Sequence, residues 1–202
     1  IQDKDVDNDR WGLIFEGSVA GDPIRFFAQD GTVASADTTT GFSVNTWHHA
    51  LGVEVSSSDR SAFIDGGSEG TNTTLKTPDN ADSISIGFAG KLTPAGYFSG
   101  LLAEIAVWDA ALTDGDVALL AKTVSPLLVR PEALVFYCPI IGRYSPEIDV
   151  IGGRGMTVTG TVAGAHPRIF YPALTQRFEF AVAAPGTAIR DVIRQGVIPR
   201  PR

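Results

Sequence analysis

The chain has 202 residues and a formal net charge of −7 at pH 7. Hydrophobic residues make up 44% of it, enough for a packed core, while 22 glycines and 12 prolines favour short strands over long helices. No apolar stretch approaches the roughly 20 residues that span a bilayer, so we expect no membrane-spanning helix and no membrane partner. The single cysteine, Cys138, lies in an apolar run, which predicts a buried, inert thiol.

Charge is distributed unevenly along the chain. Residues 1–165 contain 10 Lys or Arg and 21 Asp or Glu (net −11), whereas residues 166–202 contain six Arg and two acids (net +4). The acidic body argues against nucleic acid as a partner, while the basic end can dock on an acidic surface. The start is polar and lacks Met, so we expect no signal peptide and a processed or incomplete N-terminus. Without an internal disulfide, folding in a reducing cytosol is allowed.

Short apolar runs separated by turn residues predict many strands. Such spacing is typical of an antiparallel sandwich or barrel. Asp30-Gly31, Asp65-Gly66-Gly67 and Ala89-Gly90 supply turns, and we expect Asp65-Gly66 to join two antiparallel strands. In chain order the runs cover residues 11–15, 24–28, 42–44, 48–55, 61–64, 83–88 and 97–108.

A single short helix follows these strands. Thr113 can cap it, with Asp116 completing a capping box, and the apolar side continues to Lys122 before Pro126 ends it. Beyond that point we expect further strands at 127–129, 133–141 and 156–162. The predicted organisation is therefore a sandwich over 1–125, additional strands over 126–165, and an extended Pro/Arg-rich arm over 166–202.

The order of four motifs resembles laminin-G-like and concanavalin-A-like domains. The resemblance covers roughly residues 11–125 and implies an all-β antiparallel jelly-roll β-sandwich with one short helix. The usual opening strand of the family, before Trp11, is missing. The motifs are Asn45–Val53 with its Thr-Trp-His-His, the strand ending Ala62–Gly66, the closing segments Ile84–Gly87 and Phe98–Trp108, and the helix start Ala111–Asp114.

Structural roles are expected for the residues at the centre of these motifs. Adjacent side chains on a strand point to opposite faces, so His48 and His49 cannot grip one zinc ion together. We expect one of them to pack inside, and Trp47 and Trp108 to belong to the core, while Trp11 is a weak candidate for ligand binding. The predicted structural set is Trp47, His49, Asp65, Gly66, Gly87 and Trp108.

A partial calcium-loop pattern lies at the start of the chain. Asp5, Asp7, Asp9 and Glu16 have the spacing of four ligands, but Arg10 stands where the loop needs glycine. We therefore expect an exposed acidic terminus and no cofactor or metal, with calcium as the weaker alternative.

Catalysis is not expected. Glycanases of this fold carry two carboxylates on one strand, and Glu147-Ile148-Asp149 begins such a pattern without the second Glu. No Gly-x-Ser-x-Gly elbow is present. A Ser/His/Asp triad with distant members cannot be read from sequence, and nothing in the sequence indicates one.

The predicted arm combines prolines, arginines and aromatic residues. Because it cannot build a core of its own, we expect it to lie along the domain or a neighbouring subunit, adding a strand at a sandwich edge. The residues assigned to this assembly role are Arg168, Phe170, Tyr171, Arg177, Phe178, Phe180, Arg190 and Arg194.

Three functions fit these observations. Segments 125–137, 160–162 and 166–171 resemble parts of tailed-phage structural proteins, which implies a decoration protein on a virion surface, with self-association or other capsid proteins as partners and possible adhesion to glycans. The alternative is a carbohydrate-binding module of an extracellular adhesin or enzyme. A glycanase is the third reading and the least favoured.

Overall fold

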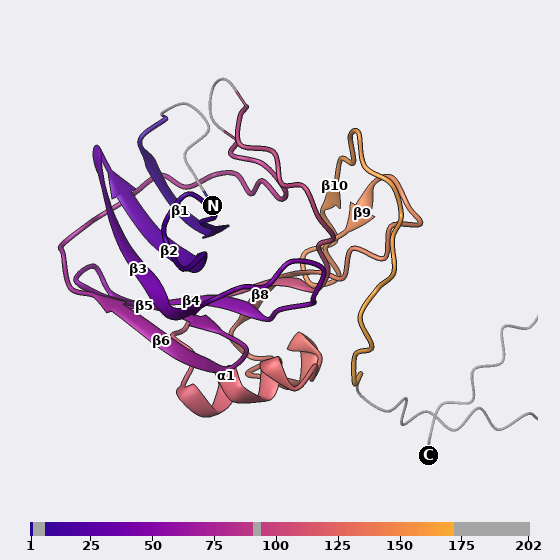
Figure 1. Ribbon diagram of the computed structural model, residues 1–202. Helices are drawn as coiled ribbons and strands as arrows, with labels where there is room; N and C mark the ends of the chain where they lie inside the picture. Colours follow the sequence, from indigo (N-terminus) through magenta and orange to yellow (C-terminus); the bar gives the residue numbers. More distant parts are fainter. Residues whose placement is uncertain (2–6, 91–93, 172–202) are drawn as a thin grey trace, which may run out of the picture. The chain divides into compact units, whose positions relative to one another are not determined.

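The N-terminal sheet contains three antiparallel strands in the order β1-β2-β3. A computed structural model describes residues 1, 7–90 and 94–171, which belong to one compact unit, Ile1–Pro172. Its first strands are β1 (Asp9–Phe15), β2 (Pro23–Asp30) and β3 (Thr32–Gly41), drawn in indigo and violet in Figure 1. Only Gly31 separates β2 from β3, and its φ of +67° permits this abrupt reversal.

A second antiparallel sheet follows, in the order β4-β5-β6. Its strands are β4 (Ala50–Ser56), β5 (Asp59–Ile64) and β6 (Gly67–Asn72). Asp65 and Gly66 join β5 to β6 with φ values of +51° and +80°, the left-handed pair of a type I′ hairpin turn. The predicted tight turn at Asp65-Gly66 is confirmed.

The two sheets approach each other closely at two positions where the strand of the second sheet has a glycine. A side chain at Gly52 of β4 would overlap the ring of Phe26 on β2, and one at Gly70 of β6 would overlap the backbone at Asp37 on β3. Ile24 and Ala28 of β2 are completely buried. These contacts make the two sheets the layers of the sandwich.

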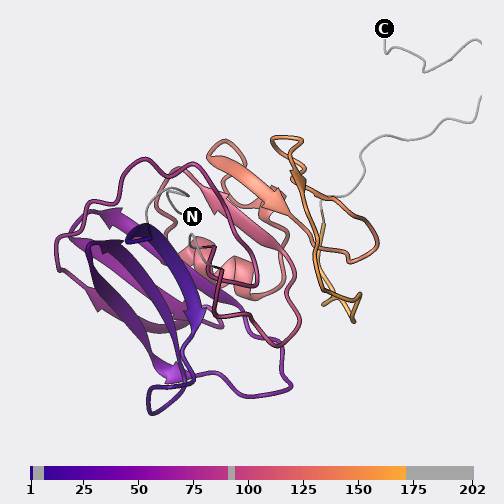
Figure 2. The same cartoon turned by 90° about the horizontal axis from the view of Figure 1, so that it is seen from above.

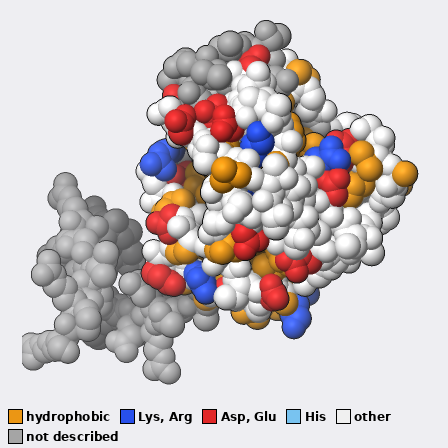
Figure 3. All heavy atoms as spheres, turned by 90° about the vertical axis from the view of Figure 1, so that its left-hand side faces the viewer, with side chains coloured by type: hydrophobic (Ala, Val, Ile, Leu, Met, Phe, Trp, Pro, Cys, Tyr) orange, Lys and Arg blue, Asp and Glu red, His pale blue; other side chains and the backbone are white. Residues whose placement is uncertain are grey.

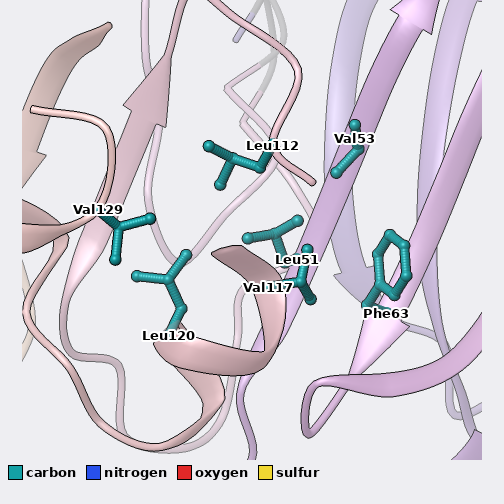
Figure 4. Close-up of a cluster of buried hydrophobic side chains, with 7 residues drawn as sticks. All are labelled: Leu51, Val53, Phe63, Leu112, Val117, Leu120 and Val129. Carbon is teal, nitrogen blue, oxygen red and sulfur yellow. The ribbon is translucent and has the colours of Figure 1, made fainter. Parts of the chain in front are cut away.

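The helix covers the other face of the second sheet. Helix α1 (Asp114–Ala121) begins at Thr113, whose side chain and that of Asp116 form the predicted capping box. Figure 1 shows α1 below β4–β6, and Figure 4 shows the apolar cluster between them. The cluster contains Leu51, Val53, Phe63, Leu112, Val117, Leu120 and Val129.

Two small sheets complete the unit. β7 (Ile105–Trp108) pairs antiparallel with β8 (Leu134–Cys138), so the predicted boundary near residue 125 falls inside one compact unit. β9 (Glu147–Ile148) pairs with β10 (Gly155–Met156), and Figure 2 shows this pair on the opposite side of the unit from β1–β3.

Several predicted strands are absent from the described residues, and two polar strands were missed. Segments 42–44, 84–87 and 98–104 form no strand, residues 126–128 form a short 3-10 helix (Pro126–Leu128), and the predicted strand 156–162 is reduced to its first residue. Conversely, β3 and β6 carry few apolar residues, so hydrophobic alternation did not reveal them. Sheet edges and close backbone packing define these strands more than apolar periodicity does.

Candidate functional site

An exposed pair of aromatic rings lies where residues 87–90 pair with residues 94–98, two segments that we call the aromatic hairpin. Its backbone pairs Phe98 N–H with the Gly87 carbonyl at 2.7 Å, and Ala89 with Ala95 in both directions. The rings of Phe88 and Tyr97 stack at a centroid distance of 6.0 Å and an interplanar angle of 22°. Tyr97 is 73% exposed. Two adjacent exposed aromatic rings combine apolar area with a polar phenol edge, which makes them a candidate recognition surface.

A chain of ring contacts anchors the aromatic hairpin to the sandwich. Phe98 packs on Phe15 at the end of β1, with ring centroids 5.4 Å apart, and Phe15 packs edge-on against Phe42 at 5.1 Å. Phe42 follows β3 and begins the loop 42–49. Gly87, predicted as structural, has a φ of +80° at the start of the hairpin. The sandwich therefore holds the stacked pair through a row of partly buried rings.

A serine and a histidine of the loop 42–49 lie in series with an aspartate of the β5–β6 turn. Ser43 Oγ lies 3.0 Å from His48 Nε2, and His48 Nδ1 lies 2.8 Å from Asp65 Oδ2. This arrangement could not be predicted from the sequence, because the aspartate comes from the β5–β6 turn, 17 residues after His48. Its order matches that of a nucleophile, a base and an orienting carboxylate.

The hydrogen bonds of this cluster hold the loop 42–49 in place and do not fit a catalytic role. The backbone N–H of Ser43 donates to His48 Nε2 at 3.0 Å, occupying the lone pair that a catalytic base offers to a serine hydroxyl. In a serine hydrolase the backbone N–H of the nucleophile instead faces the developing oxyanion. Asp65 Oδ1 also accepts the backbone N–H of His49 at 3.0 Å. The cluster therefore ties the loop to the hairpin turn.

The three tryptophans occupy different environments. Trp11 points between the sheets and donates its indole N–H to Glu54 of β4, which gives the weak ligand candidate a structural contact. Trp108 packs on the apolar cluster and donates to the Val129 carbonyl at 2.8 Å, as a partly buried core residue does. Trp47 is 41% exposed in the loop 42–49, so the structure places it at the surface and not in the expected core.

The acidic residues of the partial calcium pattern do not converge. Asp9 is the first residue of β1 and Glu16 follows its last, so the length of the strand separates them by roughly 20 Å. Asp9 accepts the Asp79 backbone N–H, while Glu16 accepts from Ser18 and Arg25. Asp7 is described and has an interaction of its own, whereas Asp5 lies outside the described residues. Within residues 1, 7–90 and 94–171, no group of three or more His, Cys, Asp or Glu has the geometry of a metal site.

The residues assigned to the arm divide between two regions. Arg168, Phe170 and Tyr171 belong to the described unit, and Phe170 and Tyr171 contact the body of the domain. Arg177, Phe178, Phe180, Arg190 and Arg194 lie outside the described residues.

A comparison with known protein families gives one match. A family model described as the concanavalin A-like lectin/glucanases superfamily matches residues 2–118, more than half of the chain. No curated protein and no solved structure matches the chain.

Proposed function

The chain belongs to the concanavalin A-like lectin/glucanases superfamily, and from that premise we propose that it is a non-catalytic domain that binds glycans through the aromatic hairpin. The family is compatible with carbohydrate binding, but a shared fold does not identify a ligand, so the proposal depends on the site. The observation that carries it is the exposed, stacked pair of Phe88 and Tyr97.

The chemistry of that pair suits a sugar. The apolar face of a pyranose ring packs on a flat aromatic ring, while the phenol of Tyr97 offers a hydrogen bond at its edge. Because the two rings already stack on each other, less side-chain freedom is lost on binding than for two isolated exposed rings. Tyr97 is 73% exposed, so the site is open to solvent, which favours a glycan chain or branched surface sugar over a small molecule enclosed in a pocket.

A glycan array followed by calorimetry tests this proposal. We expect Tyr97→Ala to weaken binding of the selected glycan by roughly tenfold or more, the usual effect of removing a central aromatic contact. The matched control is Tyr144→Ala, because Tyr144 is also strongly exposed (65%) but lies in the loop between β8 and β9. If no glycan binds, or if the two variants weaken binding equally, the proposal is wrong.

We also propose a biological setting for the domain, namely that it decorates the surface of a virus particle. It is supported by the sequence resemblance of segments 125–137, 160–162 and 166–171 to tailed-phage structural proteins. Sedimentation and electron microscopy of the source particle, with an antibody against the chain, would locate it. Recovery of the chain only as a secreted, particle-free protein would favour the alternative, a carbohydrate-binding module of an extracellular adhesin or enzyme.

The expected partners are other copies of the chain or other shell proteins, reached through the C-terminal arm. The basic charge of residues 166–202 against the acidic body supports this proposal. Deletion of residues 172–202 followed by light scattering tests it, and we expect loss of the oligomer. A truncated protein that keeps its mass and still joins its particle would refute it.

Nucleic acid and membrane are not among the proposed partners. On the face shown in Figure 3, Lys and Arg side chains are separated and interspersed with Asp and Glu, and hydrophobic side chains form small, separate areas. A nucleic-acid-binding surface instead concentrates basic residues. Among the described residues, no helix is both long and apolar enough to cross a bilayer.

A further inference from the structure

Trp47 is a large apolar side chain that the fold leaves at the surface. It is 41% exposed, and Val44 in the same loop is 79% exposed. The other two tryptophans donate their indole N–H to acceptors within the protein. Tryptophan is enriched among the residues that dominate binding energies, because its ring offers a large, rigid apolar area. The exposed indole is therefore a second candidate contact for a ligand.

Hydrogen bonds fix the backbone on the C-terminal side of Trp47. His48 Nδ1 lies 2.8 Å from Asp65 Oδ2, and the backbone N–H of His49 donates to Asp65 Oδ1 at 3.0 Å. The backbone N–H of Ser43 donates to His48 Nε2 at 3.0 Å, which closes the loop on the other side of the tryptophan. A tryptophan held in this way loses less conformational entropy on binding than one on a loosely attached loop.

The same contacts determine which nitrogen of the His48 ring has the proton. A backbone N–H can only donate, so Nε2 accepts from Ser43 and has no proton of its own. The ring proton therefore lies on Nδ1, which donates it to Asp65. The Asp65 carboxylate thus accepts two hydrogen bonds, one from each of two successive residues after Trp47.

Trp47 and the aromatic hairpin belong to the same end of the sandwich. Phe15 at the end of β1 and Phe42 after the end of β3 both lie near the start of β2. The ring centroids of Phe98 and Phe15 are 5.4 Å apart, and those of Phe15 and Phe42 are 5.1 Å apart. This row of rings joins the hairpin to the loop 42–49, and Phe98 is itself 37% exposed. Aromatic surface therefore continues from the hairpin towards the loop that contains Trp47.

We propose that Trp47 is a second aromatic contact for the glycan, so that the ligand is a stretch of a polysaccharide chain and not a single terminal sugar. This inference rests on the proposed function, because the aromatic hairpin supplies the first contact. One sugar unit packs on the stacked pair of the hairpin, and a unit further along the chain packs on the indole. The cluster of Ser43, His48 and Asp65 has a positioning role, because it holds the backbone beside the tryptophan.

Two contacts on one chain make the affinity depend on the length of the ligand. A disaccharide on the aromatic hairpin gains only the first contact. Once a long chain has bound there, its second contact forms within the complex, at a high effective concentration. We therefore expect a long oligomer to bind roughly tenfold or more tightly than the disaccharide of the same glycan.

Calorimetry with one glycan in two lengths tests the inference. The probes are the glycan that the array selects, prepared as its disaccharide and as a long oligomer. Trp47→Ala should weaken oligomer binding by roughly tenfold and leave disaccharide binding unchanged. Tyr97→Ala should weaken the binding of both. Trp47→Phe keeps a flat ring and should retain most of the affinity for the oligomer.

Asp65→Asn tests the positioning role of the cluster. Asparagine tolerates the φ of +51° at this position, so the turn itself is preserved. Its single oxygen cannot accept from both the His49 N–H and His48 Nδ1, so one of the two hydrogen bonds is lost. We expect weaker oligomer binding with unchanged disaccharide binding, a difference that a general loss of stability would not produce.

Acrylamide quenching of tryptophan fluorescence gives a readout on the wild-type protein. The oligomer should protect part of the emission from quenching, the disaccharide should not, and this protection should be absent from Trp47→Phe. If a glycan binds but its oligomer gives no protection, the inference is wrong while the proposed function stands. The same conclusion follows if Trp47→Ala weakens both lengths equally or neither. If no glycan binds, the proposed function is wrong and the inference is wrong with it.

Discussion

The Cα of Gly66 faces helix α1 so closely that a Cβ added there would lie 2.8 Å from the Cβ of Ala121. Gly66 also has a φ of +80° in the β5–β6 turn. Two independent constraints, one on the backbone and one on packing, therefore require glycine at this position.

Replacing Gly66 with valine should be strongly destabilising. We expect roughly 1–3 kcal/mol from backbone strain and roughly another 1–3 kcal/mol from overpacking against α1. Gly67→Val is the matched control, because a Cβ at Gly67 meets nothing within 4 Å. Urea denaturation of both variants measures the difference, and equal stabilities would contradict the assignment of the turn.

Replacing His49 should reduce the loss of stability that the protein shows at acidic pH. Burial, opposed in part by the Asp65 charge, lowers the pKa of His49 to about 4, and its Nδ1 is one of the described buried atoms without a hydrogen-bond partner. The unfolded chain binds a proton on His49 near pH 6.5, whereas the folded chain does so only near pH 4. The free energy of unfolding is therefore highest above pH 6.5 and falls as the pH drops towards 4.

We therefore expect His49→Leu to have near-wild-type stability at pH 7, because the replaced ring nitrogen is unpaired. The decrease in melting temperature between pH 6.5 and pH 4 should be smaller than in the wild type. Thermal denaturation by circular dichroism at half-unit pH steps measures this. An equal decrease in melting temperature for the two proteins would show that His49 does not contribute to the pH dependence of stability.

Glu147→Gln tests the proposal that the domain has no glycanase activity. Glu147 is buried, and its Oε1 accepts the Gly142 backbone N–H at 2.6 Å. Glutamine keeps an acceptor oxygen for this bond, so we expect a small effect on stability. Neither protein should release reducing ends from β-glucans. Activity in the wild type that disappears in Glu147→Gln would establish this carboxylate as catalytic.

Local chemistry made part of the fold predictable. Asp65-Gly66 and the Thr113–Asp116 capping box were identified from the sequence because each depends on residues close together in the chain. The alternating run 83–88 was predicted as a strand, but the structure forms only isolated bridges there, and its last residues begin the aromatic hairpin. Hydrophobic alternation does not reveal whether a strand finds a partner.

The candidate sites were harder to predict because tertiary contacts create them. Tyr97 looked like any aromatic residue in an apolar run, and its exposure follows from the hairpin that Phe98 anchors. His48 and Asp65, which hold the loop of Trp47, are 17 positions apart, and no spacing rule connects them. The arm was predicted to lie along the domain or a neighbouring subunit, and residues 166–171 do contact the domain.

Loss of the Asp149 charge should destabilise the region around β8 and β9. Asp149 is completely buried, and burial alone would raise its pKa, but backbone N–H donors from Tyr137, Gly152 and Ile151 outweigh it, so the pKa is lowered. Arg154 adds an ion pair at 3.3 Å. A carboxyl group with a depressed folded-state pKa contributes stability above its unfolded pKa, near 3.9, and this contribution is lost as the pH falls through the lower folded value.

Asp149→Asn keeps one acceptor oxygen but turns an amide N–H₂ towards other donors, namely a backbone N–H and the Arg154 guanidinium. We expect a cost of roughly 2–4 kcal/mol at pH 7, because buried donors lose their acceptor and the charge pair is broken. Glu132→Gln, at an exposed position before β8, is the control and should change stability by less than about 0.5 kcal/mol. Guanidinium denaturation at pH 7 and at pH 3 gives both the cost and its pH dependence. The difference between Asp149→Asn and the wild type should shrink at pH 3, because the unfolded wild-type chain already binds a proton on this carboxyl group below a pKa near 3.9. A difference that stayed constant would show that the charge is not what stabilises this region.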